Sequence, residues 1–318
     1  YFNNNSNGDR RMTKSATRVA ADKATFTQAE VTAKDTAARA GRKNLIINGG
    51  FDVWQRSESA TGTYFTYTTA DRWRHYNGAL SLTSAKYDCS SEDVPTMNAM
   101  KLTVSSGNWG LMHRIESVKA DTFTLSFYIK GSTTGALKVT DNNTSISVTT
   151  GWVKHSFIIT NGTSGQFDTF IINNTSQTFN GDVYITGVQL ELGSVATDFE
   201  HRSYGEELAL CQRYFYQHIK GAGFISLAHM YGARESYGYI DFPVTMRVPP
   251  TGSAVSGTNY YVCYTGGIGP NFNGITFSDN TTNTTRVQVT LNTNATAGNA
   301  GMYQTGNANA GVSFDAEL

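Results

Sequence analysis

The stretch VYITGVQLELGSVATDFEHRS, residues 183–203, contains the most regular strand pattern of the chain. Apolar and polar residues alternate from 183 to 186 and again from 188 to 192, with Gly187 between the two runs. This pattern predicts a β-strand with one buried face that is interrupted by a bulge at Gly187. The strand then ends in a polar tail, ELGSVATDFEHRS, whose role the rest of the chain has to explain.

Short alternating segments of the same kind fill residues 43–202. They are KLTVS (101–105), LSFYIKG (125–131), ALKVT (136–140), SISVT (145–149), WVKHSFIIT (152–160) and DTFIINN (168–174). Polar turns such as NGTSG and FNGD separate them. Strands at about ten-residue spacing, without a helical period between them, predict an antiparallel sandwich or jelly roll.

A short helix and a second set of strands follow. Ser203 with Glu206 forms a capping box, and Leu208, Cys211 and Phe215 recur at helical spacing, so SYGEELALCQRYFYQ is predicted to be a helix. After it, alternating segments return, including NYYVCYT, TRVQVTL and GVSFDAEL. We therefore predict a smaller C-terminal β domain.

The N-terminal region has a different character. Residues 1–11 are polar and rich in Asn, and residues 12–41 lack internal Gly and Pro. Apolar residues recur there every seventh position, at Met12, Val19, Phe26, Ala33 and Ala40. This seam predicts a coiled-coil or partner-anchored helix, and the alternative is a lone amphipathic helix folded onto the next domain. The predicted organisation is 1–42 lead-in and anchoring helix, 43–203 jelly roll, 204–218 linking helix and 219–318 C-terminal β domain.

The bulk composition excludes several classes of protein. The 318 residues carry 25 basic and 25 acidic side chains, which disfavours a nucleic-acid binder. The three cysteines lie far apart, so neither a disulfide framework nor a zinc site is predicted. No apolar run reaches the ~18 residues of a membrane span, so no membrane insertion is expected. Because the chain begins with Tyr1, we expect it to be a fragment or a processed product.

The tryptophans indicate a binding site for sugars. All four of them lie between residues 54 and 152, and flat aromatic faces next to polar groups are typical of sugar recognition. The predicted glycan-binding residues are Trp109, taken as an exposed loop aromatic, and Trp73, Trp54, Gln55, Arg74 and Tyr76. Core packing of the tryptophans is the alternative. A second candidate surface is the C-terminal domain with its tyrosines, Tyr231, Tyr237, Tyr239, Tyr260, Tyr261 and Tyr264.

An enzyme is not predicted. The six histidines show no paired spacing, and no GxSxG motif is present. The remaining enzymatic alternative is a hydrolase of surface polysaccharide, for which Asp71 with Glu92 or Asp93 would be the carboxylate pair.

Five segments together resemble a bacteriophage tail-fibre family that contains a jelly roll similar to carbohydrate-binding modules. They are NLIINGGFDVWQR (44–56), TADRWRHY (69–76), the run from 186 to 217, DFPVTMRVPPT (241–251) and the terminal FDAEL. The resemblance implies a virion protein, assembled in the host cytoplasm, that forms a homotrimer and binds polysaccharide of the host cell surface. The N-terminal helix would attach it to other virion proteins. A purely structural virion protein, such as a capsid decoration, head fibre or tail-assembly component, is the alternative.

The resemblance also bears on the tail and on metal content. In this kind of jelly roll the last strand pairs beside the first and its tail leads toward the next domain, which makes ELGSVATDFEHRS mainly architectural. No cofactor is predicted. A structural calcium is common in related modules at this junction, where the oxygen ligands would come from Asn48, Asp52, Asp198 and Glu200.

Overall fold

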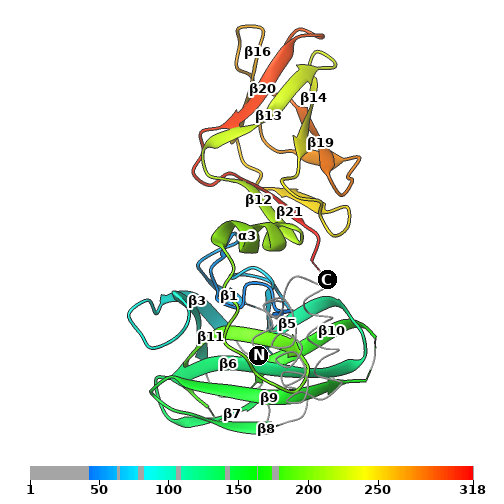
Figure 1. Cartoon of the computed structure of the whole chain (residues 1–318). Coiled ribbons are helices and arrows are strands. Elements are labelled where there is room, and N and C mark those ends of the chain that lie inside the picture. Colours follow the sequence, from blue (N-terminus) through cyan, green and yellow to red (C-terminus); the bar gives the residue numbers. More distant parts are fainter. Residues whose placement is uncertain are drawn as a thin grey trace, which may run out of the picture.

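The computed structural model describes residues 43–62, 65–77, 82–104, 109–139, 144–162, 164–173 and 179–317. The predicted lead-in and helix of residues 1–42 lie outside this part of the chain. The described residues form two β domains, one above the other in Figure 1, with a single short helix at their junction. We call them the sandwich domain (43–203) and the C-terminal domain (215–317). Within the described residues, no helix is long and apolar enough to cross a bilayer.

The sandwich domain consists of two antiparallel sheets. The six-stranded sheet has the order β1 (Ser59–Gly62), β3 (Leu82–Asp88), β4 (Asn98–Val104), β11 (Gly181–Leu192), β6 (Asp121–Gly131) and β9 (Val153–Asn161). The five-stranded sheet has the order β2 (Trp73–Asn77), β5 (Trp109–Val118), β10 (Gly165–Asn173), β7 (Gly135–Val139) and β8 (Thr144–Val148). The prediction of an antiparallel β-sandwich is confirmed.

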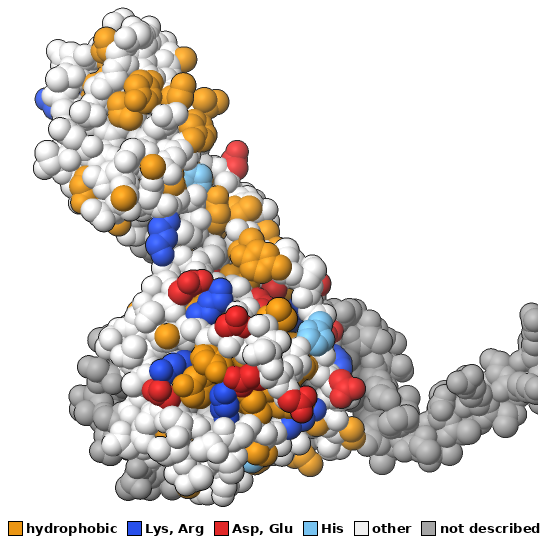
Figure 2. All heavy atoms as spheres, turned by 90° about the vertical axis from the view of Figure 1, so that its left-hand side faces the viewer, with side chains coloured by type: hydrophobic (Ala, Val, Ile, Leu, Met, Phe, Trp, Pro, Cys, Tyr) orange, Lys and Arg blue, Asp and Glu red, His pale blue; other side chains and the backbone are white. Residues whose placement is uncertain are grey.

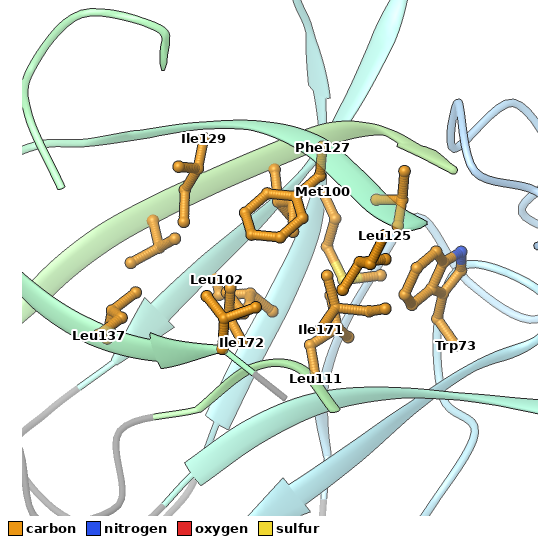
Figure 3. Close-up of a cluster of buried hydrophobic side chains, with 14 of the residues drawn as sticks. Trp73, Met100, Leu102, Leu111, Leu125, Phe127, Ile129, Leu137, Ile171 and Ile172 are labelled. Carbon is orange, nitrogen blue, oxygen red and sulfur yellow. The ribbon is translucent and has the colours of Figure 1, made fainter. Parts of the chain in front are cut away.

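The two sheets enclose one hydrophobic core. Leu125, Phe127 and Ile129 of β6 point inward, as the alternation in LSFYIKG predicts, and all three are fully buried. Figure 3 shows Leu125 facing Ile171 of β10 and Leu111 of β5, and Ile129 on the side of Leu137 of β7. Burial of such apolar side chains is the main force that holds two sheet faces together.

Strand β11 contains the predicted bulge. Its pairing with β6 shifts register between Thr186 and Gln189, and Gly187 has φ 59°. A side chain there would be strained by the left-handed backbone. It would also meet the Tyr128 ring, since an added Cβ would lie 3.0 Å from Tyr128 Cδ2. The bulge therefore lets two alternating runs share one strand.

Replacement of Gly187 by alanine is expected to destabilise the sandwich domain by about 1 to 2 kcal/mol. The cost comes from the positive φ and from the displaced Tyr128 ring. Urea unfolding followed by tryptophan fluorescence would measure it. The variant Gly151→Ala is the control, because nothing lies within 4 Å of a Cβ added at Gly151. Equal stability of the two variants would contradict the bulge geometry.

The N-terminal segment lies beside the last strand, as the resemblance implies, but it is irregular and not a strand of the sheet. The Leu45 amide donates to the Leu190 carbonyl at 2.9 Å, and the Val188 amide donates to the Gly49 carbonyl at 2.9 Å. Gly49 allows this approach, because an added Cβ would lie 2.1 Å from the Val188 oxygen. Strand β11 itself pairs with β4 and β6.

The polar tail after β11 fastens this N-terminal segment. The Glu200 carboxylate accepts from the backbone amides of Lys43 (3.3 Å) and Asn44 (2.8 Å). Arg202 donates to the Ile46 carbonyl at 3.1 Å and pairs with Glu207 at 3.2 Å. The tail therefore has an architectural role, since its charged groups bond backbone that would otherwise lie unpaired.

The linking helix is shorter than predicted. Helix α3 spans Tyr204–Gln212, and its N-cap Ser203 accepts from the Glu206 amide, as the capping box predicts. The residues after Arg213 leave the helix and enter β12 (Phe215–Lys220). Phe215 and Tyr216 of YFYQ pair with β21 there, so tertiary pairing overrides the helical spacing of Phe215.

The C-terminal domain is a second antiparallel β unit. A three-stranded sheet has the order β12, β21 (Gly311–Asp315) and β15 (Thr251–Ala254). A seven-stranded sheet has the order β17 (Asn271–Phe272), β16 (Tyr261–Thr265), β20 (Ala300–Thr305), β13 (Gly223–Met230), β14 (Glu235–Asp241), β19 (Thr284–Thr290) and β18 (Thr276–Ser278). Its core is separate from that of the sandwich. In the segment DFPVTMRVPPT, residues 242–250 belong to no strand. Asp241 ends β14, and Thr251 begins β15.

Three of the sequence motifs meet between the two domains. Arg56 of WQR pairs with Asp71 of DRW at 3.0 Å and with Glu317 of the terminal segment at 3.3 Å. Arg72 also pairs with Glu317, and its guanidinium lies 3.5 Å from the centre of the Tyr214 ring. We call this the interdomain network. These three motifs, which are part of the family resemblance, thus hold the two domains together.

The buried carboxyl of Asp71 gives this network a pH dependence. Burial raises its pKa from 3.8 to about 6, although Arg56 lowers it. The folded protein then holds the proton more tightly than the unfolded chain, so the contribution of Asp71 to stability falls as pH rises from about 4 to about 6. At most about 3 kcal/mol is involved.

The variant Asp71→Asn tests this dependence. Free energies of unfolding of both proteins are measured from pH 4 to 7, and the difference, wild type minus variant, is plotted. We expect that difference to fall by about 2 to 3 kcal/mol toward pH 6.5. A difference that stays flat would show that Asp71 has an ordinary pKa.

Candidate functional site

Two of the predicted sugar-binding tryptophans are core residues. Trp73 is fully buried, donates to the Asn48 carbonyl at 2.8 Å and packs 4.8 Å from the Phe51 ring. Trp109 is only 2% exposed. The expectation that Trp109 is an exposed loop aromatic is wrong, because β5 begins at this residue and its ring joins the core. In this structure neither ring offers a face to a sugar.

Trp54 and Gln55 are also structural. Trp54 packs partly buried against the core and donates to the Phe51 carbonyl. The Gln55 side chain donates to the Phe215 carbonyl at 2.8 Å and accepts from the Gln217 amide at 3.2 Å. Gln55 therefore joins the sandwich domain to β12.

Arg74 and Tyr76 lie on the outer face of the five-stranded sheet. The Arg74 guanidinium is buried 4.5 Å from the centre of the Phe65 ring and pairs with Asp168 at 3.6 Å. Tyr76 packs partly buried against the same Phe65 ring at 5.4 Å. The six predicted residues are thus divided between the core, the contact with β12 and the outer face of the five-stranded sheet, and they do not share one exposed surface.

A conservative change at Trp73 separates packing from binding. Trp73→Phe is expected to cost about 2 kcal/mol of stability, because the smaller ring leaves space and the Asn48 carbonyl loses one of its two donors. The affinity of the folded variant for any glycan should stay within about twofold of wild type. Unfolding in urea and a binding titration measure the two quantities. Lost affinity with unchanged stability would restore Trp73 as a contact residue.

The structure brings together a different set of aromatic residues. Tyr87 of β3, Tyr184 of β11 and Trp152, which directly precedes β9, surround Lys130 of β6 on the outer face of the six-stranded sheet. The Lys130 ammonium lies 5.0 Å from the centre of each of these three rings. We call Tyr87, Trp152, Tyr184, Lys130 and Glu92 the Trp152 platform.

The period of the strands sets the direction of each side chain. Val183 and Ile185 of β11 are fully buried, so Tyr184 between them points away from the core. Lys130 follows the buried Ile129 and lies directly opposite Tyr184 in the β6–β11 pair. The Tyr87 and Tyr184 rings meet edge to face at 4.6 Å. Such pairs are the favoured geometry of neighbouring aromatic rings.

Glu92 fixes the platform from one side. Its carboxylate accepts from the Tyr87 hydroxyl at 2.6 Å, from Lys130 at 2.6 Å and from the Trp152 indole N–H. Burial raises the pKa of Glu92, but the bonds from Lys130, Tyr87 and Trp152 outweigh it and lower the pKa overall. The hydrogen bond to Glu92 raises the pKa of Tyr87. At neutral pH the platform therefore holds an ionised Glu92, a protonated Lys130 and a neutral phenol.

The platform is partly open to solvent. The side chains of Lys130 and Glu92 are 15% and 23% exposed, and all three rings are partly exposed. Beside it, Lys101 pairs with Asp182 at 2.8 Å and lies 5.9 Å from the Tyr184 ring. Figure 2 shows a face of the lower domain on which charged and hydrophobic side chains alternate in this manner. This is the mixture of ring faces and hydrogen-bonding groups that sugar hydroxyls and C–H groups require.

Sequence reasoning missed this site for a definable reason. The alternation at 183–186 identifies Tyr184 as an outward residue between Val183 and Ile185, but it does not show which other aromatic residues share that face. Tyr87, Tyr184 and Trp152 are far apart in the sequence, and Tyr87 and Tyr184 become neighbours only because β11 packs next to β4 and, through it, β3. The usable signal was outward aromatics at alternate positions of predicted strands.

Several of the residues considered for calcium and for hydrolysis are engaged elsewhere. Glu200 bonds backbone amides, and the Asp52 carboxylate accepts from Asn98 at 2.9 Å. Over the described part of the chain, no group of three or more His, Cys, Asp or Glu residues is placed to hold a metal ion. Asp71 belongs to the interdomain network and Glu92 to the platform, so these two carboxylates sit in separate hydrogen-bond networks.

The six tyrosines of the predicted second surface divide into three groups, and one of these, Tyr237 and Tyr260, is partly buried. Tyr261 is buried in the core and donates to the Val255 carbonyl at 2.6 Å, so it has a structural role. Tyr231, Tyr239 and Tyr264 are exposed. The exposed group is the part of the predicted second surface that a partner could reach.

No family model matches the chain, and a search of curated proteins finds no match. Among solved structures, TmCBM61 in complex with β-1,4-galactotriose is similar over 48% of this chain and 99% of that chain, with 21% identity and a TM-score of 0.34. The tandem CBM22 domain of Paenibacillus barcinonensis Xyn10C is similar over 81% and 97%, with 9% identity and a TM-score of 0.32. The enzymatically active domain of tailspike protein 4 of bacteriophage CBA120 is similar over 47% and 21%, with 14% identity and a TM-score of 0.32.

TM-scores this far below 0.5 establish neither a shared fold nor a shared ligand. The architecture given above therefore rests on the sheet order and the core of this chain. The resemblance of its motifs to a bacteriophage tail-fibre family stays a prediction.

Proposed function

We propose that this chain is a non-catalytic glycan-binding protein whose binding site is the Trp152 platform. The observation that carries the proposal is the arrangement of three partly exposed aromatic rings at 5.0 Å around one lysine that a carboxylate neutralises. Aromatic faces stack on the C–H groups of a pyranose ring, and the polar atoms at their rims bond its hydroxyls.

The platform is organised before a ligand arrives. The Glu92 carboxylate accepts hydrogen bonds from the Tyr87 hydroxyl and from the Trp152 indole N–H, so it fixes both rings. It also accepts from Lys130. Side chains that are already fixed lose little conformational entropy on binding, which favours affinity. A weak single site becomes useful when several copies bind together.

The charge pairing favours uncharged sugars. Lys130 is paired with Glu92, and the neighbouring Lys101 is paired with Asp182. Neither lysine is left as a free cation for a carboxylate or sulfate of an anionic polysaccharide. The proposed ligand is therefore a neutral polysaccharide, and its binding should depend weakly on salt.

The narrower proposal is a tail-fibre or receptor-binding protein on the surface of a bacteriophage, which binds host cell-surface polysaccharide and forms a homotrimer through its N-terminal helix. It is supported by the motifs that resemble those of tail fibres, several of which lie in the interdomain network or in the tail whose Glu200 and Arg202 bond the N-terminal segment. Specific retention on host cells, absent on resistant strains, would support it. A virion protein that only mediates packing would bind no cell and no sugar.

Affinity electrophoresis of the full chain through gels that contain neutral or anionic polysaccharides tests the proposed function. We expect retardation in at least one neutral polysaccharide, with little change between 50 and 500 mM salt, and no release of reducing sugar. Retardation only in anionic gels, abolished by salt, would contradict the neutral-ligand proposal. Release of reducing sugar would indicate a hydrolase.

A further inference from the structure

The outer face of the seven-stranded sheet carries an apolar row that runs across four strands. Tyr264 of β16 lies opposite Met302 of β20, and Met302 lies opposite Leu227 of β13. Leu227 lies opposite Tyr239 of β14, because Ala228 pairs with Gly238 in the antiparallel ladder. The four side chains are 48%, 39%, 72% and 58% exposed in this order.

A row of this kind is typical of a surface that binds a partner. Monomeric proteins rarely expose contiguous apolar side chains over a large area. Shallow hollows border Leu227 on both sides, one of about 470 Å³ beside Tyr239 and one of about 590 Å³ beside Tyr264 and Met302. Figure 2 shows hydrophobic side chains gathered on the upper domain. The Leu227 and Met302 side chains in the middle cannot satisfy sugar hydroxyls, which favours a protein surface over a glycan.

We propose that this face binds the same face of a second copy of the chain around a two-fold axis. An isologous interface has to be complementary to itself. From β16 to β14 the row is Tyr264, Met302, Leu227 and Tyr239. It has an aromatic side chain at each end and two aliphatic ones in the middle, so it has the same pattern when it is reversed. A two-fold axis between Met302 and Leu227 places Met302 of each copy on Leu227 of the other, and Tyr264 of each copy on Tyr239 of the other.

Charge and area agree with a second copy as the occupant. The row contains no charged side chain, and the chain as a whole carries 25 basic and 25 acidic residues, so two copies do not repel each other. Met and Tyr are enriched, and charges depleted, in the buried core of protein interfaces. Outside the row, Arg286 of β19 lies opposite Tyr239, pairs with Asp279 at 3.0 Å and provides a polar rim.

The sheet is also large enough. Its seven strands, at about 4.8 Å spacing, span about 30 Å. The five central strands have five to eight residues each, about 20 Å on average. The face therefore covers about 600 Å² per copy, or about 1,200 Å² for the pair, which reaches the lower end of specific interfaces.

The variant Leu227→Asp tests the pairing in the full chain. In a two-fold contact it places two like charges close to the axis, so the dissociation constant should rise at least about 100-fold. Ile158→Asp is the matched control, because Ile158 is a strand residue of the sandwich domain that is 58% exposed. Sedimentation velocity over a range of concentrations compares the three proteins, and any association through residues 1–42 is common to all of them.

With increasing concentration, the average mass of wild type and of Ile158→Asp is expected to approach twice that of Leu227→Asp at the same concentration. Equal average masses of all three proteins at every concentration would overturn the proposal. Loss of association in both Ile158→Asp and Leu227→Asp would also overturn it.

Disulfide trapping tests the geometry without placing a charge in the face. Tyr264→Cys and Tyr239→Cys are prepared separately, each with its native cysteines buried. Mixed under mild oxidation, they should form a cross-linked dimer at least about tenfold faster than either variant alone, because only 264 and 239 meet across the axis. Equal rates for the mixture and the single variants, or no cross-link in the mixture, would overturn the two-fold arrangement.

Discussion

Replacement of Trp152 by alanine is expected to weaken binding of a neutral oligosaccharide about 10- to 150-fold, or about 1.5 to 3 kcal/mol. The change removes the largest ring of the platform. It also removes the indole donor to Glu92, so the carboxylate and Lys130 lose one of the contacts that fix them. Isothermal titration of the oligosaccharide retained in the gel assay measures the loss.

The control for this change is Tyr204→Ala. Tyr204 is a 60% exposed aromatic residue at the start of α3, outside the platform. Its replacement should leave the affinity within about twofold of wild type. Stability should also distinguish ligand contact from core packing. Because Trp152 is partly exposed, its replacement should cost less stability than replacement of the buried Trp73. Unchanged affinity of folded Trp152→Ala would move the binding site away from the platform.

Replacement of Arg72 by methionine is expected to destabilise the protein by about 3 to 5 kcal/mol. The Arg72 side chain is 1% exposed and its partner Glu317 is 6% exposed, so the variant would leave a buried carboxylate with Arg56, at 3.3 Å, as its one remaining ion-pair partner among the described residues. It would also remove the guanidinium from the Tyr214 ring and its bond to the Arg114 carbonyl. Removing one member of a buried pair is costly because the charge that remains is desolvated.

Urea unfolding followed by tryptophan fluorescence measures this loss, because all four tryptophans lie in the sandwich domain. Arg213→Met is the matched control. Arg213 and its partner Glu116 also join the two domains, but their side chains are 37% and 38% exposed, so solvent screens the pair and less than about 1 kcal/mol should be lost. Losses of similar size in the two variants would contradict the central role of the buried network.

Local sequence patterns predicted most of the fold. The two-residue period of LSFYIKG and of the 183–192 strand correctly predicted which side chains enter the core, and the glycine between two alternating runs correctly predicted the bulge. Ser203 was correctly predicted as a helix cap. These features depend on neighbours within a few residues, where backbone geometry and burial act directly.

The site could not be predicted in the same way. A tryptophan looks alike in sequence whether it fills a core or faces solvent, and Trp109 illustrates this because its position at the start of β5 turns the ring inward. Gln55 and Arg74 offered suitable polar groups, but contacts with residues distant in the sequence engage them. The platform depends on strand order, which joins residues 87, 130, 152 and 184 across the sheet.

The length of α3 shows the same limit. The spacing of Cys211 and Phe215 is helical, yet Phe215 pairs with Asp315 in β12 and β21. This long-range pairing ends the helix early. Local propensity is a weak signal where a partner strand is available.

The most direct measurement of the central claim is a tryptophan fluorescence titration with the retained oligosaccharide, performed on wild type and on Trp152→Phe. Trp73 and Trp109 are buried and cannot report a ligand on the outer face, and Trp54 packs against the core. We predict a saturable change in wild type that is lost in Trp152→Phe, while Tyr204→Ala keeps it. A saturable change of the same size in Trp152→Phe would contradict the assignment of glycan binding to the platform.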